Sequence, residues 1–320
     1  MNLEKKNKNS IAIIGNQTIT KFLIDYLKNK GLKISYIITL KNKKKYNITD
    51  TFNFKKEKIK LIEVKSYNLK NNLDILKIKK LKLDFLLVFG WSRLVPEWLI
   101  KHVKLATIGV HAGIYSPPRS RGRAVFNWAL IGGYKKMLCY AMMLKPGVDN
   151  GDIFIKRNIS ITQHDDIESL YLKNSLISSE FFYKIISNWG YYKKNLTKQS
   201  NNLASYFPKR EPSDGFINWN NNVDEIFNLI KALKIPYPNA YTEYKSTKIL
   251  INEAMPFEYY KKSRKKNGEI VTVFPDQKFL VRCKDSFLLV KSFKTSKDFT
   301  PKVGMKFISS SIKKFDFSKI

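Results

Sequence analysis

Short apolar runs alternate with amphipathic segments along the first part of the chain. Residues Ile11 to Gly15 form an apolar run that ends in a glycine, which predicts a buried strand followed by a turn. The next segment has the apolar spacing of one helix face, made by Ile19, Phe22, Leu23, Tyr26 and Leu27. A second strand is predicted over 33–40. This strand–helix–strand order indicates a parallel sheet with helices on its faces.

The same alternation continues to about residue 190. Phe85 to Phe89 is an apolar run typical of a buried strand, and Pro96 begins a short helical segment. Further strands are predicted over 106–110, 138–144 and 152–161, and further helices over 124–131 and from Asp165 to near Gly190. The sequence therefore predicts a Rossmann-like α/β domain over residues 1–195.

The composition changes at the polar stretch 195–205, which we interpret as a linker. Beyond it, a helix is predicted from Val223 to Leu233, ending before Pro236. The remaining apolar runs are short and strand-like, at 248–251, 270–274, 279–281 and 287–290. Residues 206–320 are thus predicted to form a smaller, β-rich, barrel-like domain.

Charge adds one ambiguity. The formal net charge is +33, and positive charge attracts nucleic acids. Lysine, however, is spread through the whole chain together with Asn and Ile, and the densest basic run, 40–60, falls between predicted elements. We interpret that run as a solvated loop. A less specific conclusion is that the positive charge attracts phosphorylated substrates.

Several classes of protein are disfavoured by what the chain lacks. No apolar run is long enough to span a membrane, and the first ten residues lack the apolar core of a signal peptide. The two cysteines, Cys139 and Cys283, lie far apart, so we expect reduced thiols and a cytoplasmic protein. No residue cluster has metal-ligand spacing, and no spaced glycines follow Gly15, so neither a metal nor a nicotinamide cofactor is expected.

The candidate chemistry centres on one histidine. Only three histidines occur in 320 residues, and His111 follows the apolar run 106–110 at the end of a predicted strand. A turn-forming Asp149-Asn-Gly segment comes later in the chain. A histidine oriented by a carboxylate at strand ends is suited to acid–base group transfer.

These segments together resemble the folate-dependent formyltransferases, a family that includes methionyl-tRNA formyltransferases and N-formyltransferases of nucleotide-linked amino sugars. The motifs that carry the resemblance are His111, Arg121-Gly122 and Asp149-Asn-Gly-Asp152. The segments 208–219 and 229–240 are similar to the start of the family's C-terminal region. The resemblance covers roughly residues 10–300.

The resemblance implies 10-formyltetrahydrofolate as the formyl donor and an amine as the acceptor. It implies that His111 relays protons or donates to the developing oxyanion, with Asp149 as its partner or as the acceptor of the amine proton. It also implies a folate pocket made by Phe89, Gly90, Trp91, Ala141 and Leu144. The basic turn supplies candidate phosphate ligands, namely Arg121, Gly122 and Arg123.

One departure from the family stands out. The family has an asparagine two residues before the histidine, and this chain has Gly109 there. Loss of one such donor to an oxyanion can cost roughly a hundred- to a thousandfold in rate. Backbone amides near Gly109, Ser116 or Asn127 are candidate replacements.

The sequence leaves more than one class of molecule as the acceptor of the formyl group. We expect a nucleotide-linked amino sugar, because Arg121 to Trp128 is similar to the matching stretch of the enzyme that formylates UDP-4-amino-arabinose. The alternatives are a methionyl-tRNA formyltransferase, and an inactive homologue that binds folate or a sugar nucleotide. A homodimer is a further expectation, with no membrane partner.

Overall fold

The computed structural model describes residues 9–42, 45, 50–258, 265–311 and 315–320, and the first eight residues and part of the basic run 40–60 lie outside this set. The chain divides into two compact units. The first comprises residues 1–122, 138–159 and 172–206, and the second comprises 123–137, 160–171 and 207–320. Each is described separately below.

A seven-stranded sheet forms the centre of the first unit, in the order β3-β2-β1-β4-β5-β7-β8. The first five strands in this order are parallel, and β7 runs antiparallel to β5. The expected mostly parallel α/β sheet is therefore confirmed. Its strands are β1 (Ile11–Ile14), β2 (Tyr36–Leu40), β3 (Lys60–Val64), β4 (Phe85–Val88), β5 (Ala106–Gly113), β7 (Lys136–Met143) and β8 (Asp152–Ser160).

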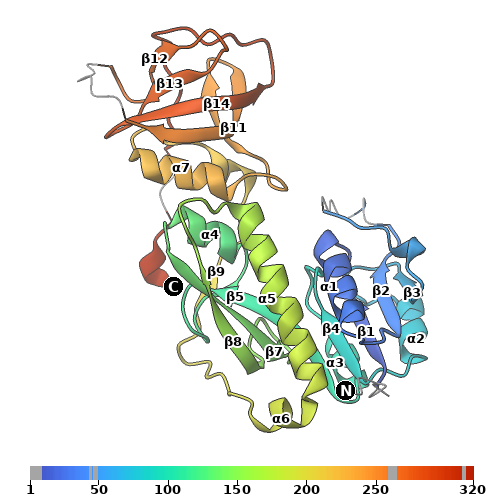
Figure 1. Ribbon diagram of the computed structural model, residues 1–320. Coiled ribbons are helices and arrows are strands. Elements are labelled where there is room, and N and C mark those ends of the chain that lie inside the picture. The colour runs from blue at the N-terminus through green and yellow to red at the C-terminus, as the bar shows by residue number, and fades with distance from the viewer. Residues whose placement is uncertain (1–8, 43–44, 46–49, 259–264, 312–314) are drawn as a thin grey trace. The chain divides into compact units, whose positions relative to one another are not determined.

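Helices cover both faces of this sheet, as Figure 1 shows. On one face, Phe182 of α5 stacks edge-to-face on Phe89, and Lys30, at the end of α1, lies over the ring of Tyr183 of α5. On the other face, Ile78 of α2 and Leu99 of α3 join one apolar cluster with Leu86. These helices are α1 (Thr18–Asn29), α2 (Asn72–Lys79), α3 (Glu97–His102) and α5 (Ile167–Ser187), of which residues 172–187 belong to this unit, and α6 (Trp189–Lys194) follows.

The sequence did not predict β3 and α2. The strand β3 begins at an exposed lysine that is also the last residue of the basic run, so its apolar signal is weak. Helix α2 leaves Leu73 and Leu76 exposed, which blurs its apolar face. Side-chain caps compensate, because Asn71 accepts hydrogen bonds from the backbone amides of Leu73 and Asp74.

The second unit is built on a five-stranded antiparallel sheet in the order β10-β11-β14-β13-β12. Helix α7 packs on it, and its apolar core includes Ile230, Trp219 and Phe279. The elements are α4 (Val125–Ile131), α7 (Val223–Ala232), β10 (Ala240–Tyr244), β11 (Thr247–Phe257), β12 (Ile270–Val273), β13 (Phe279–Arg282) and β14 (Phe287–Thr295).

A single segment joins the two edges of this sheet. The amide of Ile308 donates to Glu243 on β10, and the amide of Ile270 on β12 donates to Met305. Because residues 305–308 bridge β10 and β12, the sheet closes in the manner of a small barrel. The expected barrel-like β domain is thus present. Short elements complete the chain: β6 (Arg121–Gly122), β9 (Tyr206–Phe207), and single turns at Phe54–Lys56, Pro212–Gly215 and Phe317–Lys319.

Neither cysteine forms a disulfide, and both Cys139 and Cys283 are buried thiols. None of the helices in the described part of the chain combines the length and apolar character needed to span a bilayer.

Candidate active site

His111 lies on β5 and faces oxygen atoms on both sides of its ring. Its Nδ1 is 3.6 Å from Oδ2 of Asp149, and its Nε2 is 3.0 Å from the carbonyl oxygen of Ser120. The His111 and Asp149 side chains are 13% and 21% exposed. Nε2 and the Ser120 carbonyl are within hydrogen-bond distance, whereas Nδ1 and the Asp149 carboxylate are at ion-pair distance, beyond a direct hydrogen bond.

The turn at Asp149 is fixed by its backbone conformation and by a hydrogen bond to its carboxylate. Asp149 adopts a left-handed conformation, with φ of 48°, and its Oδ2 accepts a hydrogen bond of 3.0 Å from the amide of Gly122. Gly151 is required nearby, because a Cβ there would lie 2.0 Å from the carbonyl oxygen of Met143. The turn therefore brings the carboxylate to His111 across 38 residues of chain.

Of the two aspartates in the Asp149–Asp152 segment, only Asp149 faces His111. The Asp152 carboxylate instead pairs with Lys145, with its Oδ1 2.8 Å from Nζ. Within this segment, the structure thus brings a single carboxylate to the histidine.

Tyr140 on β7 pairs with His111 on β5 in the antiparallel register of the two strands. The two rings meet edge-to-face, with centroids 5.6 Å apart. Burial raises the pKa of the Tyr140 phenol, so it remains protonated. Its hydroxyl is buried and has no hydrogen-bond partner among the described residues.

The residues expected to line a folate pocket divide between the two faces of the sheet. Trp91 and Leu144 belong to the apolar cluster on the α2–α3 face, and Leu144 also packs against Tyr140 and Met142. Phe89 contacts α5 on the opposite face, and Ala141 is fully buried. Gly90 has φ of 76°, and a Cβ there would lie 2.4 Å from the Thr20 hydroxyl, which donates to the Phe89 carbonyl. Phe89 and Ala141 could therefore reach a ligand beside His111 only through their backbone.

The residues expected to bind phosphate also differ in their positions. Arg121 is only 1% exposed, and its guanidinium binds Gln199 and Asn201. Gly122 uses its amide to bind Asp149. Arg123 is exposed and is the one of the three with a solvent-facing side chain.

Gly109, where the resemblance implies an asparagine, has a neighbouring side chain in the space that a larger residue would fill. A Cβ on Gly109 would lie 2.8 Å from Cδ2 of Leu144 and 3.1 Å from its Cγ. Asn127, one suggested replacement donor, is buried in the second unit and donates to the Ala232 carbonyl at 2.7 Å.

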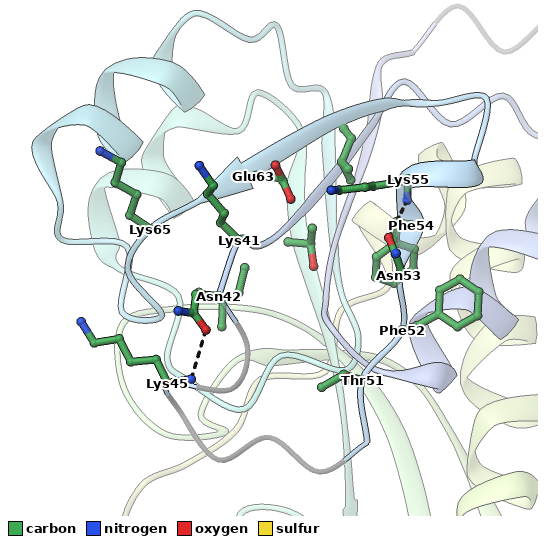
Figure 2. Close-up of a pocket in the computed structure, with 13 residues that line it drawn as sticks. Lys41, Asn42, Lys45, Thr51, Phe52, Asn53, Phe54, Lys55, Glu63 and Lys65 are labelled. Carbon is green, nitrogen blue, oxygen red and sulfur yellow. Dashed lines mark hydrogen bonds between the residues drawn. The ribbon is translucent and has the colours of Figure 1, made fainter.

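A cavity of about 840 Å³ lies elsewhere on the first unit, at the ends of β2 and β3. Figure 2 shows Lys41, Lys55, Lys65 and Glu63 around it. It contains neither His111 nor Asp149, and strands β1 and β4 lie between β2 and β5 in the sheet. Among the residues that the structure describes, no group of three metal-ligating side chains comes together.

Two models of known protein families match the two parts of the chain. The formyl transferase profile matches residues 8–185, and the profile of the formyl transferase C-terminal domain matches residues 209–301. The chain belongs to the formyl transferase family.

Two curated relatives illustrate the range of this family. The chain is 31% identical over 238 residues to the bifunctional polymyxin resistance protein ArnA of Wigglesworthia glossinidia brevipalpis, covering 74% of this chain and 35% of that protein. It is 30% identical over 203 residues to a methionyl-tRNA formyltransferase of Caldanaerobacter subterraneus, covering 63% and 64%. The chain thus matches less than two thirds of either relative's length.

Solved structures share the fold at low identity. An N-formyltransferase from Helicobacter canadensis, in complex with folinic acid and dTDP-3-aminofucose, has a TM-score of 0.64 and 17% identity, covering 88% of this chain and 99% of that one. A methionyl-tRNA formyltransferase from Clostridium thermocellum has a TM-score of 0.55 and 19% identity, covering 77% and 93%.

Sequence reasoning missed the segment around Gln199. Its polar composition predicts a linker, yet the bridge between Ile153 and Thr197 and the contacts of Gln199 attach it to the site. The segment carries no periodic signal that could have revealed this.

Proposed function

We propose that this chain transfers a formyl group from 10-formyltetrahydrofolate to the amine of a nucleotide-linked amino sugar. The observation that carries the transfer reaction is the approach of His111 to Asp149, 3.6 Å apart, within the formyl transferase domain. Both residues are partly exposed, so an acceptor amine can reach them.

The chain's own residues account for the proton movements. Attack by an amine on a formyl carbon requires a base for the amine proton and a donor for the developing oxyanion. Asp149 is a fixed carboxylate that can take a proton directly or through His111. The Nε2 of His111 can donate to the Ser120 carbonyl at 3.0 Å, and its Nδ1 faces the Asp149 carboxylate at 3.6 Å, so this pair can take the proton of the attacking amine and return it to the amine that leaves.

The described residues fit a folate. Bound folate would supply the formyl group and a leaving amine. On the same sheet face as His111, Trp91 and Leu144 provide an apolar wall, and the buried indole N–H of Trp91 has no partner among the described residues. Apolar walls with a few convergent polar groups are typical of small-molecule sites.

Arg123 supports a diphosphate-bearing acceptor. It is exposed and directly follows Gly122, whose amide holds Asp149. A guanidinium matches phosphate oxygens in geometry and charge. The match to ArnA over 74% of the chain and the resemblance of Arg121 to Trp128 to the sugar enzyme agree with this acceptor.

A tRNA amine is the second candidate, favoured by the methionyl-tRNA formyltransferase relatives and by the lysines at the cavity of Figure 2. Lysine contacts with phosphates release counterions, so binding would weaken steeply as salt rises. A nucleotide sugar, with two phosphates, should show a much shallower salt response.

The test is mass spectrometry of acceptors after incubation with 10-formyltetrahydrofolate. The panel contains UDP- and dTDP-linked 3- and 4-amino sugars together with methionyl-tRNA. We expect a formyl gain on one nucleotide sugar. Formylation of methionyl-tRNA alone would establish the second candidate, and no formylation of any acceptor would favour an inactive homologue in which Gly109 has replaced a needed donor.

A further inference from the structure

We propose that Gln199 is a positioning residue that fixes the Asp149 turn against His111. The inference rests on the proposed formyl transfer, because Asp149 is assigned a role only in that reaction. Gln199 lies in a segment without regular structure, 50 residues beyond Asp149 in the sequence.

The Gln199 carboxamide connects the two loops that form the site. Its Oε1 accepts a hydrogen bond of 3.0 Å from Nη2 of Arg121. Its Nε2 donates to the carbonyl oxygens of Asp149 at 3.2 Å and of Gly151 at 2.5 Å. One side chain thus holds the basic turn and the aspartate turn at the same time.

The chemistry of the partners determines how this amide is oriented. Arginine offers only donors, so it must face the Gln199 oxygen. Backbone carbonyls only accept, so they must face the Gln199 nitrogen. The reversed amide would place donor against donor and acceptor against acceptor. The orientation is therefore required by the partners rather than by convention.

Arg121 gives this contact its rigidity. The side chain is 1% exposed, and no carboxylate lies within ion-pair distance of it among the described residues. Its guanidinium is held by neutral acceptors, Gln199 and Asn201 at 3.0 Å each, and the Tyr206 hydroxyl at 3.4 Å. A buried cation that loses one of few acceptors is costly, so these bonds should persist.

The Asp149 turn needs such support. Its left-handed backbone is unfavourable for a residue with a side chain, by roughly 1 kcal/mol. Gln199 holds the carbonyl of Asp149 itself, while the Gly122 amide holds the carboxylate. Without Gln199, Asp149 would keep its side-chain contact but lose the backbone contact that sets its position.

The matched variants are Gln199→Met and Asn201→Ala. Methionine keeps the length of the side chain and removes both hydrogen-bonding functions. Asn201→Ala also removes an acceptor of Arg121, but among the described residues the Asn201 side chain makes no hydrogen bond to residues 149–151. Gln199→Glu is the second test, because it keeps an acceptor for Arg121 and removes the donor to the two carbonyls.

Two readouts are used. The first is the ¹⁵N spectrum of the histidine rings, in which the His111 signals are assigned by their loss in His111→Ala. We expect Gln199→Met and Gln199→Glu to change the His111 pattern in the direction seen in Asp149→Asn, with Asn201→Ala unchanged. The second is kinetic: kcat should fall roughly tenfold in Gln199→Met, with KM changed less than about twofold, because binding contacts are intact while the base is misplaced.

A purely structural role would lower the melting temperature and leave the His111 signals as in the wild type, which would overturn the proposal. The ring spectrum does not depend on turnover. If the wild type formylates no acceptor, the proposed function fails while the spectrum still decides the role of Gln199.

Discussion

The contact between Gly109 and Leu144 makes the most distinctive prediction. The resemblance to formyltransferases implies an asparagine at this position, and here Leu144 fills the space. A Cβ on Gly109 would lie 2.8, 3.1 and 3.2 Å from Cδ2, Cγ and Cδ1 of Leu144. Gly109→Asn alone should therefore overpack this part of the sheet, whereas Gly109→Asn with Leu144→Ala should not.

The expected magnitudes follow from the geometry. Overpacking costs about 1–3 kcal/mol, and the low end applies because the colliding atoms are at the end of a flexible side chain. Leu144→Ala, at a half-buried site, should cost about 1–2 kcal/mol. Since the truncation removes the collision, the double variant should be more stable than additivity predicts by about 1 kcal/mol.

The assay is urea unfolding of the four proteins of this double-mutant cycle. Leu138→Ala serves as the control partner, because Leu138 is another half-buried leucine packed against the cluster of Tyr140 and Met142 but is not among the closest contacts that a Cβ on Gly109 would make. Its cycle with Gly109→Asn should be additive. An additive result for Leu144 as well would refute the conclusion that Leu144 occupies the asparagine's space.

Three further predictions concern other contacts. Arg157 and Lys184 lower the pKa of Glu180 to about 2, so its contribution to stability is present above about pH 4.5 and lost as the pH falls toward 2. Glu180→Gln should therefore reduce the free energy of unfolding by about 1 kcal/mol at pH 7, allowing for solvent screening, and by progressively less in acid; an equal loss in acid would contradict this. Gly151→Ala should lower the melting temperature, through a loss of at least about 1 kcal/mol, because the carbonyl that its Cβ meets belongs to the backbone and cannot move aside as a side chain can. Arg123→Ala should raise KM for a nucleotide sugar roughly tenfold in steady-state kinetics, through loss of charge-assisted hydrogen bonds to phosphate, and an unchanged KM would exclude Arg123 from acceptor binding.

The apolar pattern predicted the elements with strong, continuous signals. The strand at Ile11–Ile14, the following helix and the strand at Phe85–Val88 all lie where expected, because both strands are largely buried and the helix buries Leu23, Ile24 and Leu27. The pattern failed at Lys60–Val64 and Asn72–Lys79. There, order comes from pairing with β2 and from caps, which local hydrophobicity does not report.

The candidate site was only partly accessible to sequence reasoning. Motifs singled out His111 and Asp149, and the structure places them together. The burial of Arg121 could not be foreseen, because it depends on acceptors from residues 199–206, some 80 positions later. Gln199 was equally hidden, since its role arises from backbone carbonyls, which no side-chain motif encodes.

The most direct test of the account is a competition in a single tube. Wild type, His111→Ala and His164→Ala are each given 10-formyltetrahydrofolate with an amino-sugar nucleotide and methionyl-tRNA, and both products are measured by mass spectrometry. His164 is the matched control, because it is exposed and, among the described residues, its side-chain hydrogen bond is to the adjacent Gln163. We expect formylated sugar nucleotide from wild type and His164→Ala and none from His111→Ala. Formylation by His111→Ala at the wild-type rate, or formylation of the tRNA alone, would contradict this expectation.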